Sequence, residues 1–419
     1  MIDRLSSMTS PEYPLDVDAI RQQFPLLERK VHGDKTLVYL DSAATTPKPQ
    51  AVIDAVNRHY SLGTANVHRA AHELSEEATE AYEGARRSVS QFINASSSNE
   101  IIFTRSATEA VNLVANAWGP ANLKPGDEIL VTEMEHHANI VPWQLLEARL
   151  GVSLKFIPMN DHGVLEMDAF DSLLTDRTRL VAATWISNAL GTVNPIEEIV
   201  SRAREAGAAT LVDATQALPH RPVDVTGLGA DFIVFSGHKM YAPTGIGCLW
   251  GREQLLEEMP PWQGGGDMIE TVSFEKTTYN RLPWKFEAGT PHIAGAIGLG
   301  AAVNWLTDLG MANIAAQESM LLGELAGTLS AIERVTLVGD PEHRAAAISF
   351  MVEGMHPHDV GAMLDKHGIA VRTGHHCAQP TMQHFKVPAT VRASLGVFNN
   401  QSDIEALDKA LRRVIEVFG

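Results

Sequence analysis

The chain has 419 residues, of which 45% are hydrophobic and 20% are charged, a composition typical of a globular protein with two or three domains. Its net charge of −18 at pH 7 disfavours a surface that binds nucleic acid or an anionic membrane. Two cysteines are too few for a disulfide scaffold, no apolar run approaches membrane-spanning length, and the first residues lack the apolar core of a signal peptide. We therefore expect a cytoplasmic protein.

Strand-like and helix-like segments alternate along the first half of the chain. A helix is expected where Val17, Ile20 and Phe24 recur at helical spacing before Pro25. Stretches of helical length, such as 196–207, also lie between apolar runs. This alternation predicts an α/β fold with a mostly parallel sheet covered by helices on both faces. The predicted strands are 37–40, 101–103, 129–131, 180–186, 211–212 and 232–235.

Polar residues follow five of these predicted strands at the carboxyl end. Ser106 to Glu109 form a capping-box pattern, and the free backbone N–H groups of such a helix start attract anions. Open α/β sheets bind ligands at this edge, so we expect the functional site there. The other four strand ends carry Glu135-His136-His137, Asn188, Asp213 with Gln216, and Ser236 with His238 and Lys239.

The pattern changes in the second half of the chain. The stretch 259–290 predicts a long irregular region, and 294–309 predicts a helix that leads to a second domain. In that domain we expect a helix near 314–332, strands at 347–350 and 369–371, and a last helix opened by a capping box, Ser402 to Glu405. The predicted domains are an N-terminal segment that packs on the small domain (1–35), a large domain (36–293), and a linking helix with the small domain (294–419).

Lys239 and Asp213 carry the most informative chemistry. A lysine directly after a buried strand is costly to charge, and the lowered pKa frees its amine to form a Schiff base. Asp213 ends another buried strand and needs a cation or donor, although a helix cap or a structural ion pair is the alternative. Pyridoxal 5′-phosphate requires a Schiff-base lysine, a carboxylate at its ring nitrogen and an anion site for its phosphate. Thr108, Ser236 and His238 are the candidates for that anion site.

Five motifs, in their order along the chain, resemble one enzyme family. Over nearly the whole chain the resemblance is to the SufS-type, group II cysteine desulfurases, which are fold-type I pyridoxal-phosphate transferases. It implies a large domain with a mostly parallel seven-stranded sheet, a smaller α+β C-terminal domain, and a homodimer with active sites at the subunit interface. The motifs are Glu135-His136-His137-Ala138-Asn139, Asp213-Ala214-Thr215-Gln216, Ser236-Gly237-His238-Lys239, Phe286-Glu287-Ala288-Gly289-Thr290-Pro291 and Arg372-Thr373-Gly374-His375-His376-Cys377-Ala378.

The resemblance also implies which residues bind the cofactor. Lys239 would hold it through a Schiff base and then move a proton at the substrate Cα. His136 would stack on the cofactor ring and assist proton transfer, while Asp213 would keep the ring nitrogen protonated. The remaining implied contacts are Gln216 at the phenolic oxygen and, at the phosphate, Thr108, Ser236, His238 and, from the other subunit, Thr290.

The substrate end of the site follows from the same resemblance. Arg392 and Asn188 would hold the carboxylate of L-cysteine, and Arg372 would either join them or stabilise the neighbouring loop. Cys377 would attack the substrate sulfur, leaving L-alanine and an enzyme persulfide. The sulfur would pass to a SufE-like or SufU-like acceptor protein for the assembly of iron–sulfur clusters or other sulfur compounds. L-selenocysteine would be a second substrate.

Several of these residues have other interpretations. Ser236-x-x-Lys239 also matches penicillin-binding acyl enzymes, but their companion motifs Ser-Asp-Asn and Lys-Thr-Gly do not occur here. The 17 histidines allow a metal-binding scaffold, but no Cys-x-x-Cys is present, and we expect no metal. On its own Arg392 fits a surface strand. Cys248 fits an inert core position, and Cys377, near imidazoles, fits a reactive thiol.

Overall fold

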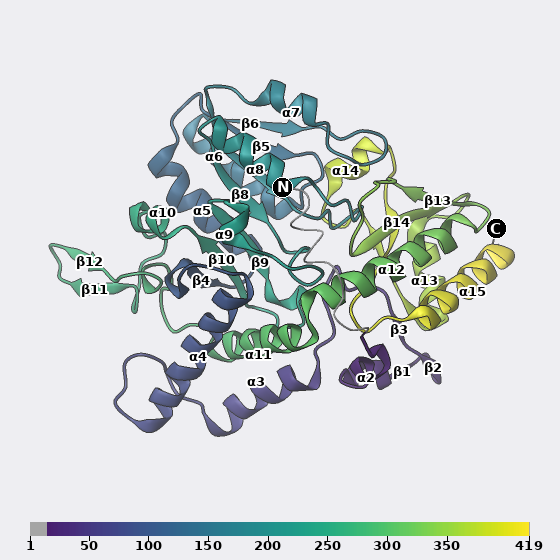
Figure 1. Cartoon of the computed structure of the whole chain (residues 1–419), viewed down its shortest axis with the longest axis horizontal. Coiled ribbons are helices and arrows are strands. Elements are labelled where there is room, and N and C mark those ends of the chain that lie inside the picture. The colour runs from purple at the N-terminus through teal and green to yellow at the C-terminus, as the bar shows by residue number, and fades with distance from the viewer. Residues whose placement is uncertain (1–14, 419) are drawn as a thin grey trace.

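The computed structural model describes residues 15–418, and a seven-stranded sheet forms the centre of its larger part (Figure 1). In order across the sheet, the strands are β4 (Ile101–Thr104), β10 (Gly247–Gly251), β9 (Phe232–Ser236), β8 (Ala209–Asp213), β7 (Thr178–Thr184), β5 (Glu128–Thr132) and β6 (Ser153–Ile157). Neighbours from β9 to β6 are parallel, whereas β10 runs antiparallel to β9 and β4. The predicted α/β fold with a mostly parallel seven-stranded sheet is confirmed.

Successive residues of the central strands point to opposite faces of this sheet, as the pleat of a strand requires. In β9, Phe232 and Val234 belong to the apolar cluster on one face, and Ile233 and Phe235 belong to the cluster on the other. All residues of this strand are buried, which explains its continuous apolar run. Apolar packing on both faces of the sheet therefore fixes β9 and, with it, the start of the turn that follows.

Helices cover both faces of the sheet (Figure 1). On one face the apolar cluster includes side chains of α5 (Ala107–Asn122), α6 (Val141–Leu150) and α10 (Glu253–Glu258). The cluster on the other face includes side chains of α3 (Gln50–Leu62), α4 (Glu73–Phe92), α7 (Met167–Leu173), α8 (Ile196–Glu205), α9 (Val225–Leu228) and α11 (Ile293–Leu309). Helix α11 packs along α3 and α4 and leads into the C-terminal part of the chain.

The C-terminal part is a smaller α+β unit with its own core. Its antiparallel sheet has the order β13 (Val335–Val338), β14 (Ala347–Val352), β17 (Thr390–Ser394) and β16 (Arg372–Gly374). The helices of this unit are α12 (Met311–Ser330), α13 (Pro357–Lys366), α14 (Gln379–His384) and α15 (Gln401–Phe418). A separate apolar cluster, which includes Leu325, Phe350 and Leu407, fills the space between this sheet and α12, α13 and α15.

The N-terminal elements contact this smaller unit. Arg21, in α2 (Val17–Arg21), forms an ion pair of 2.7 Å with Asp403 of α15. A turn at Pro25–Glu28 and the short pair β1 (Lys30–Val31) and β2 (Lys35–Thr36) follow. Strand β3 (Val38–Tyr39) then pairs in parallel with β15 (Ile369–Ala370) of the smaller unit. The predicted domain limits stay a prediction, and residues 1–14 of the predicted segment 1–35 lie outside the described residues.

Two local predictions differ from the structure. The capping box predicted at Ser402 to Glu405 is wrong, because the reciprocal bonds join Asn400 and Asp403. The N–H group of each residue donates to the side-chain oxygen of the other, at 3.3 Å in both cases. Asparagine caps helices as well as serine does, so two helix starts compete in this sequence.

The stretch 259–290 is not wholly irregular. It contains a hairpin, β11 (Ile269–Val272) and β12 (Thr277–Tyr279), which projects from the molecule (Figure 1). Its strands are mostly exposed, with Phe274 in the turn between them. Exposed strands need no apolar alternation, which removes the pattern on which their prediction depends.

Within residues 15–418, no single helix has the length and apolar character needed to cross a membrane, and α11 and α12 meet these criteria only as a pair bent by 76°.

Candidate active site

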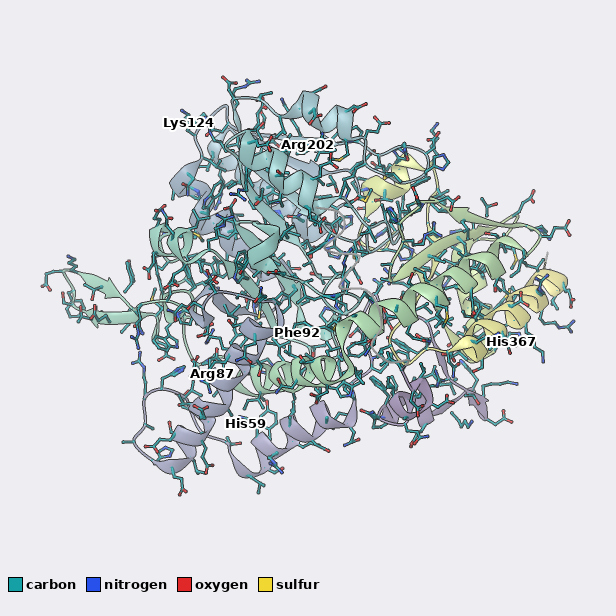
Figure 2. All side chains as sticks on the ribbon, viewed as in Figure 1. His59, Arg87, Phe92, Lys124, Arg202 and His367 are labelled. Carbon is teal, nitrogen blue, oxygen red and sulfur yellow. The ribbon has the colours of Figure 1, made fainter. Side chains whose placement is uncertain are left out.

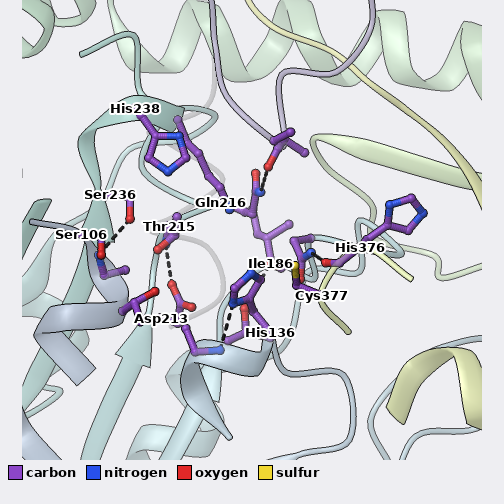
Figure 3. A pocket seen from close by; sticks show the side chains of 18 of the residues that line it. Ser106, His136, Ile186, Asp213, Thr215, Gln216, Ser236, His238, His376 and Cys377 are labelled. Atoms are coloured by element: carbon purple, nitrogen blue, oxygen red, sulfur yellow. Dashed lines mark hydrogen bonds between the residues drawn. The ribbon is translucent and has the colours of Figure 1, made fainter. Parts of the chain in front are cut away.

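A cavity of about 180 Å³ lies where β5, β7, β8 and β9 end and where β16 and β17 of the smaller unit approach them (Figure 3). Polar and charged side chains dominate its lining. The predicted site residues found there are Thr108, His136, Asn188, Asp213, Gln216, Ser236, His238, Lys239, Arg372, Cys377 and Arg392. Eleven of the twelve predicted residues therefore come together in one cavity, and Thr290 does not.

Lys239 lies in the short turn Gly237–Lys239 that directly follows β9. The pKa of its amine is lowered to about 8, chiefly by burial and also by the nearby guanidinium groups of Arg392 and Arg372. The carboxylate of Asp213 acts in the opposite direction. At pH 7 this amine is therefore still mostly protonated, but roughly a tenth of it is uncharged, far more than at the ordinary pKa, as a nucleophilic lysine requires.

Asp213 is the last residue of β8 and is only 6% exposed. Its Oδ1 atom accepts a hydrogen bond of 2.9 Å from the backbone N–H of Thr215, which orients the carboxylate. Glu135 lies nearby, and burial is the main reason that its pKa rises to about 8, with a further contribution from Asp213. Asp213 therefore brings a carboxylate to the floor of the cavity (Figure 3).

The start of α5 forms one wall of the cavity, where a helix N-terminus favours an anion. The Ser236 hydroxyl accepts a hydrogen bond of 2.8 Å from the backbone N–H of Ala107. Ser106 caps the helix by accepting from the N–H of Glu109 at 3.4 Å. The predicted capping box is only half formed, however, because the Glu109 carboxylate accepts from the N–H of Arg105 rather than from that of Ser106.

Several buried polar atoms at the cavity have no hydrogen-bond partner among residues 15–418. They are Oε1 of Gln216, Oγ1 of Thr215, Nδ1 of His376 and Nε of Arg392. Buried polar groups are normally paired, because an unpaired one costs free energy. Unpaired atoms around a cavity with a nucleophilic lysine, a carboxylate and a helix N-terminus fit a polar, anionic cofactor such as pyridoxal phosphate.

The imidazole of His136 is held in one tautomer. Its Nδ1 atom accepts a hydrogen bond of 3.0 Å from the backbone N–H of Ala138, so the proton of the neutral ring is on Nε2. Burial lowers the pKa of His136 to about 3, and the charge of Lys239 lowers it as well. The ring is therefore neutral near pH 7 and faces the cavity (Figure 3).

Cys377 lies in a four-residue connection, 375–378, between β16 and α14. His376 and Cys377 both adopt left-handed backbone conformations, with φ values of 53° and 58°, which are strained for residues other than glycine. Three hydrogen bonds hold the connection. Asn188 Nδ2 donates to His376 O at 2.6 Å, His137 N donates to Cys377 O at 2.8 Å, and Gln379 N donates to His137 Nε2 at 3.1 Å.

Arg392 is a central residue of β17 and is 1% exposed, which rules out the surface-strand alternative. Its Nη1 donates to the backbone oxygen of Asn188 at 2.8 Å, and its Nη2 donates to Asp41 Oδ1 at 3.0 Å. Burial lowers the pKa of the guanidinium to about 10, a value that still leaves it charged at neutral pH. Arg372 also lines the cavity, on the neighbouring strand β16.

Thr290 is exposed and lies in a different hollow, together with Arg105, Gly245 and His292. It is therefore not part of the cavity formed by its own chain, and its contribution from a second subunit stays a prediction. Cys248 is fully buried in β10, and burial raises the pKa of its thiol well above the usual range, as expected of an inert thiol.

Sequence reasoning missed three residues that shape the site. Asp41, which pairs with Arg392, follows the predicted strand 37–40 in the same way as the other polar residues follow theirs, so this signal was present. His137 belongs to the motif Glu135 to Asn139 but carries no predicted role, yet its backbone N–H donates to the carbonyl oxygen of Cys377. No comparable sequence pattern indicates Lys48, because its contact with the site is a hydrogen bond to the backbone oxygen of His238, 190 positions away. Among residues 15–418 no group of three potential metal ligands occurs.

Comparisons with known proteins agree with this architecture. The aminotransferase class-V family matches residues 38–407. A protein of Streptomyces coelicolor named probable cysteine desulfurase is 50% identical over 97% of this chain and 98% of its own length. A cysteine desulfurase of Shigella sonnei is also 50% identical, over 96% of this chain and 99% of its own.

Solved structures give the same result. The cysteine desulfurase CsdA of Escherichia coli, in its S-sulfonic acid form, is 39% identical with a TM-score of 0.90, and the match covers 97% of this chain and 100% of that one. The apo cysteine desulfurase of Thermococcus onnurineus is 38% identical with a TM-score of 0.92, over 98% and 100%. The chain is thus an enzyme of the aminotransferase class-V family, and it belongs with the cysteine desulfurases of that family.

Proposed function

We propose that the protein is a pyridoxal-phosphate-dependent cysteine desulfurase, which converts L-cysteine to L-alanine and transfers the sulfur to Cys377. The observation that carries the proposal is the single cavity in which Lys239, Asp213, Arg392 and Cys377 meet from four separate elements. The names of relatives that are 50% identical over almost the whole chain support the same activity.

The cofactor is pyridoxal 5′-phosphate, and the residues of the cavity suit each part of it. When bound, it supplies an electron sink for the negative charge that develops at the substrate Cα. The amine of Lys239, with its lowered pKa, is suited to covalent attachment, and the Asp213 carboxylate is suited to a protonated ring nitrogen. Thr108, at the start of α5, and Ser236 and His238, at the end of β9 and in the turn after it, are suited to the phosphate.

Arg392 is the proposed anchor of the substrate carboxylate. Its guanidinium is charged, buried and fixed by Asn188 O and Asp41, and its Nε–H points to no protein acceptor within residues 15–418. A carboxylate accepts bidentate hydrogen bonds from such a group. Asn188 Nδ2 donates one of its two hydrogens to His376 O, so the proposed contact of Asn188 with substrate uses the second N–H.

Proton movement at the substrate Cα is assigned to Lys239, and His136 is assigned a place beside the cofactor ring. Lys239 is the candidate base at the substrate Cα, because its pKa of about 8 is near the working pH. His136, with its proton on Nε2, can donate a hydrogen bond into the cavity but remains uncharged. Its ring therefore serves as a flat, neutral neighbour of the cofactor.

Cys377 is the proposed sulfur acceptor. As a thiolate it attacks the sulfur of the substrate, and a bond forms between that sulfur and its own Sγ. The substrate Cβ–S bond breaks, its electron pair stays with the carbon fragment, and protonation at Cβ completes L-alanine. The partly exposed position of Cys377 at the cavity leaves the persulfide accessible to an acceptor.

We further propose the SufS-type, group II assignment, with transfer of the sulfur to a SufE-like or SufU-like protein for iron–sulfur cluster or other sulfur-compound assembly. The support is the short connection 375–378 and its three anchoring hydrogen bonds, which keep Cys377 close to the cavity. A homodimer, with Thr290 reaching the partner's site, and activity on L-selenocysteine belong to the same proposal.

Turnover of the purified, cofactor-loaded protein with L-cysteine tests this function. We expect L-alanine and transferred sulfur in equal amounts, with faster turnover when an acceptor protein is added. Formation of a keto acid instead of alanine would show that the chain is an aminotransferase rather than a desulfurase. Absence of acceleration by SufE-like and SufU-like proteins would contradict only the group assignment.

A further inference from the structure

The carbonyl oxygen of His238 receives four donors from one short segment of the chain. Thr46 N and Thr45 Oγ1 both lie at 3.0 Å, Lys48 Nζ lies at 3.0 Å, and Thr46 Oγ1 lies at 3.2 Å. A carbonyl oxygen has only two lone pairs, so such crowding is unusual. This carbonyl belongs to the peptide that joins His238 to Lys239.

Lys48 is the unexpected member of this group. Its amine forms no ion pair with a carboxylate of residues 15–418; it donates instead to the backbone oxygens of Thr46, at 2.6 Å, and of His238. Burial lowers the pKa of Lys48 to about 7. Because burying an amine without a counter-ion costs free energy, its place here points to a function beyond solubility.

The same segment also holds the chain on the other side of Lys239. The backbone N–H of Tyr241 donates to Thr46 Oγ1 at 2.8 Å. Tyr241 is fully buried and has a left-handed backbone with φ of 68°, a conformation that a tyrosine adopts only when its surroundings impose it. The segment 45–48 therefore fixes the peptide before Lys239 and the residue two positions after it.

We propose that Lys48, with Thr45 and Thr46, is a positioning residue that aims the amine of Lys239 at the bound cofactor. The inference rests on the proposed function and deepens it. His238 is held by the same peptide, and its ring lines the cavity (Figure 3). A displaced 238–239 peptide would thus misplace the nucleophile and a candidate phosphate contact together. Misplacement of a reacting group by about 1 Å can cost about 100-fold in rate.

The test uses the full-length chain with three variants and one control. Lys48→Met removes the donor and keeps the length of the side chain, Lys48→Arg restores a donor, and Thr45→Val removes a second donor with little change in shape. Lys124→Met is the control, because Lys124 is exposed and lies at the outer edge of the molecule (Figure 2). Thermal unfolding confirms that each variant is folded.

Two measurements separate a positioning role from a structural one. The first is the rate at which pyridoxal phosphate, returned to stripped protein, attaches to Lys239, as found by borohydride trapping and peptide mapping. The second is kcat and KM for L-cysteine. We expect Lys48→Met to attach at least about 10-fold more slowly and to lower kcat with KM unchanged, since Arg392 is untouched. Thr45→Val is expected to give a smaller effect of the same kind.

The outcomes are distinguishable. Rescue of both rates by Lys48→Arg, with Lys124→Met at the parent rate, supports the positioning role. Parent rates of attachment and turnover in Lys48→Met overturn it; if that variant does not fold, parent rates in Thr45→Val overturn it. If the parent protein itself attaches no cofactor at Lys239, the proposed function fails, and this inference fails with it.

Discussion

Asn188 holds the backbone next to the reactive cysteine: its Nδ2 atom donates to the carbonyl oxygen of His376 at 2.6 Å. Asn188 follows a strand of the large sheet, whereas His376 belongs to the connection between β16 and α14. His137 adds a backbone hydrogen bond to Cys377 O in this connection, and its ring accepts one from the N–H of Gln379, the first residue of α14. Residues of the larger unit thus hold Cys377 in a left-handed conformation, and the position of its thiol at the cavity depends on them.

The first prediction concerns this anchoring. Asn188→Ala removes the hydrogen bond to His376 O, and His137→Ala removes the side-chain acceptor of Gln379 N while keeping its own backbone bond to Cys377 O. Each variant should speed hydrogen exchange of the amides of 375–379, because each loses a hydrogen bond that opposes backbone strain. We expect alanine formation to fall by about 10-fold or more, since the thiol is no longer held at the substrate sulfur. His375→Ala, an exposed change within the same connection, is the control. Unchanged exchange in both anchoring variants would contradict the account of the loop.

The second prediction concerns the pH dependence of stability. The pKa of the Lys239 amine is about 8 in the folded protein, whereas its ordinary value, which applies to the unfolded chain, is 10.5. Between these values the unfolded chain binds more protons, so the free energy of unfolding of the cofactor-free protein should rise with pH. Lys239→Met should lose this rise and be more stable than the parent at pH 7, by up to roughly 3 kcal/mol.

Denaturant unfolding of both proteins between pH 7 and pH 10.5 measures the difference, and other titrating groups cancel in the comparison. If the free energy of unfolding had the same pH dependence in parent and variant, burial would not lower the pKa of Lys239. Its activation as a nucleophile would then need another cause.

The third prediction concerns the substrate carboxylate. Arg392→Lys keeps a positive charge but loses the planar fork that contacts Asn188 O and Asp41. We expect kcat/KM for L-cysteine to fall by about 100-fold, with the cofactor still attached to Lys239. Arg372→Lys, the same change at the residue that pairs with Arg392 on the neighbouring strand, is the matched comparison. Equal, small effects of both changes on kcat/KM would remove Arg392 from the substrate site.

Much of the central architecture could be predicted because its strands are buried on both faces. In a chain whose strands alternate with helices, the apolar run Phe232 to Phe235 predicts a central, fully buried strand. The polar residues that follow the strands then lie at one edge of the sheet. Of the candidate site, Lys239 and Asp213 could be proposed from residue chemistry alone. The reactivity of Cys377 could be proposed from its histidine-rich loop, but its role as sulfur acceptor and the role of Arg392 depended on the resemblance to a family.

Other features could not be predicted from local patterns. The pairing of Asp41 with Arg392 joins residues that are 351 positions apart, and Lys48 contacts a carbonyl 190 positions away. No periodicity encodes such contacts, because they depend on how the two units meet. Thr290 is exposed on its own chain, so its role depends on a second subunit that a single sequence does not describe.

The central claim is that Cys377 takes the substrate sulfur while Lys239 holds the cofactor. Its most direct test is peptide mass spectrometry of the cofactor-loaded protein after incubation with L-cysteine, with Lys239→Ala as the inactive control. Cys248 is an internal control, because it is fully buried and its thiol pKa is raised. The account predicts one additional sulfur atom on the Cys377 peptide, none on the Cys248 peptide, and none on either in Lys239→Ala. Alanine release by the parent protein with no additional sulfur on Cys377, or at the parent rate in Cys377→Ser, would contradict it.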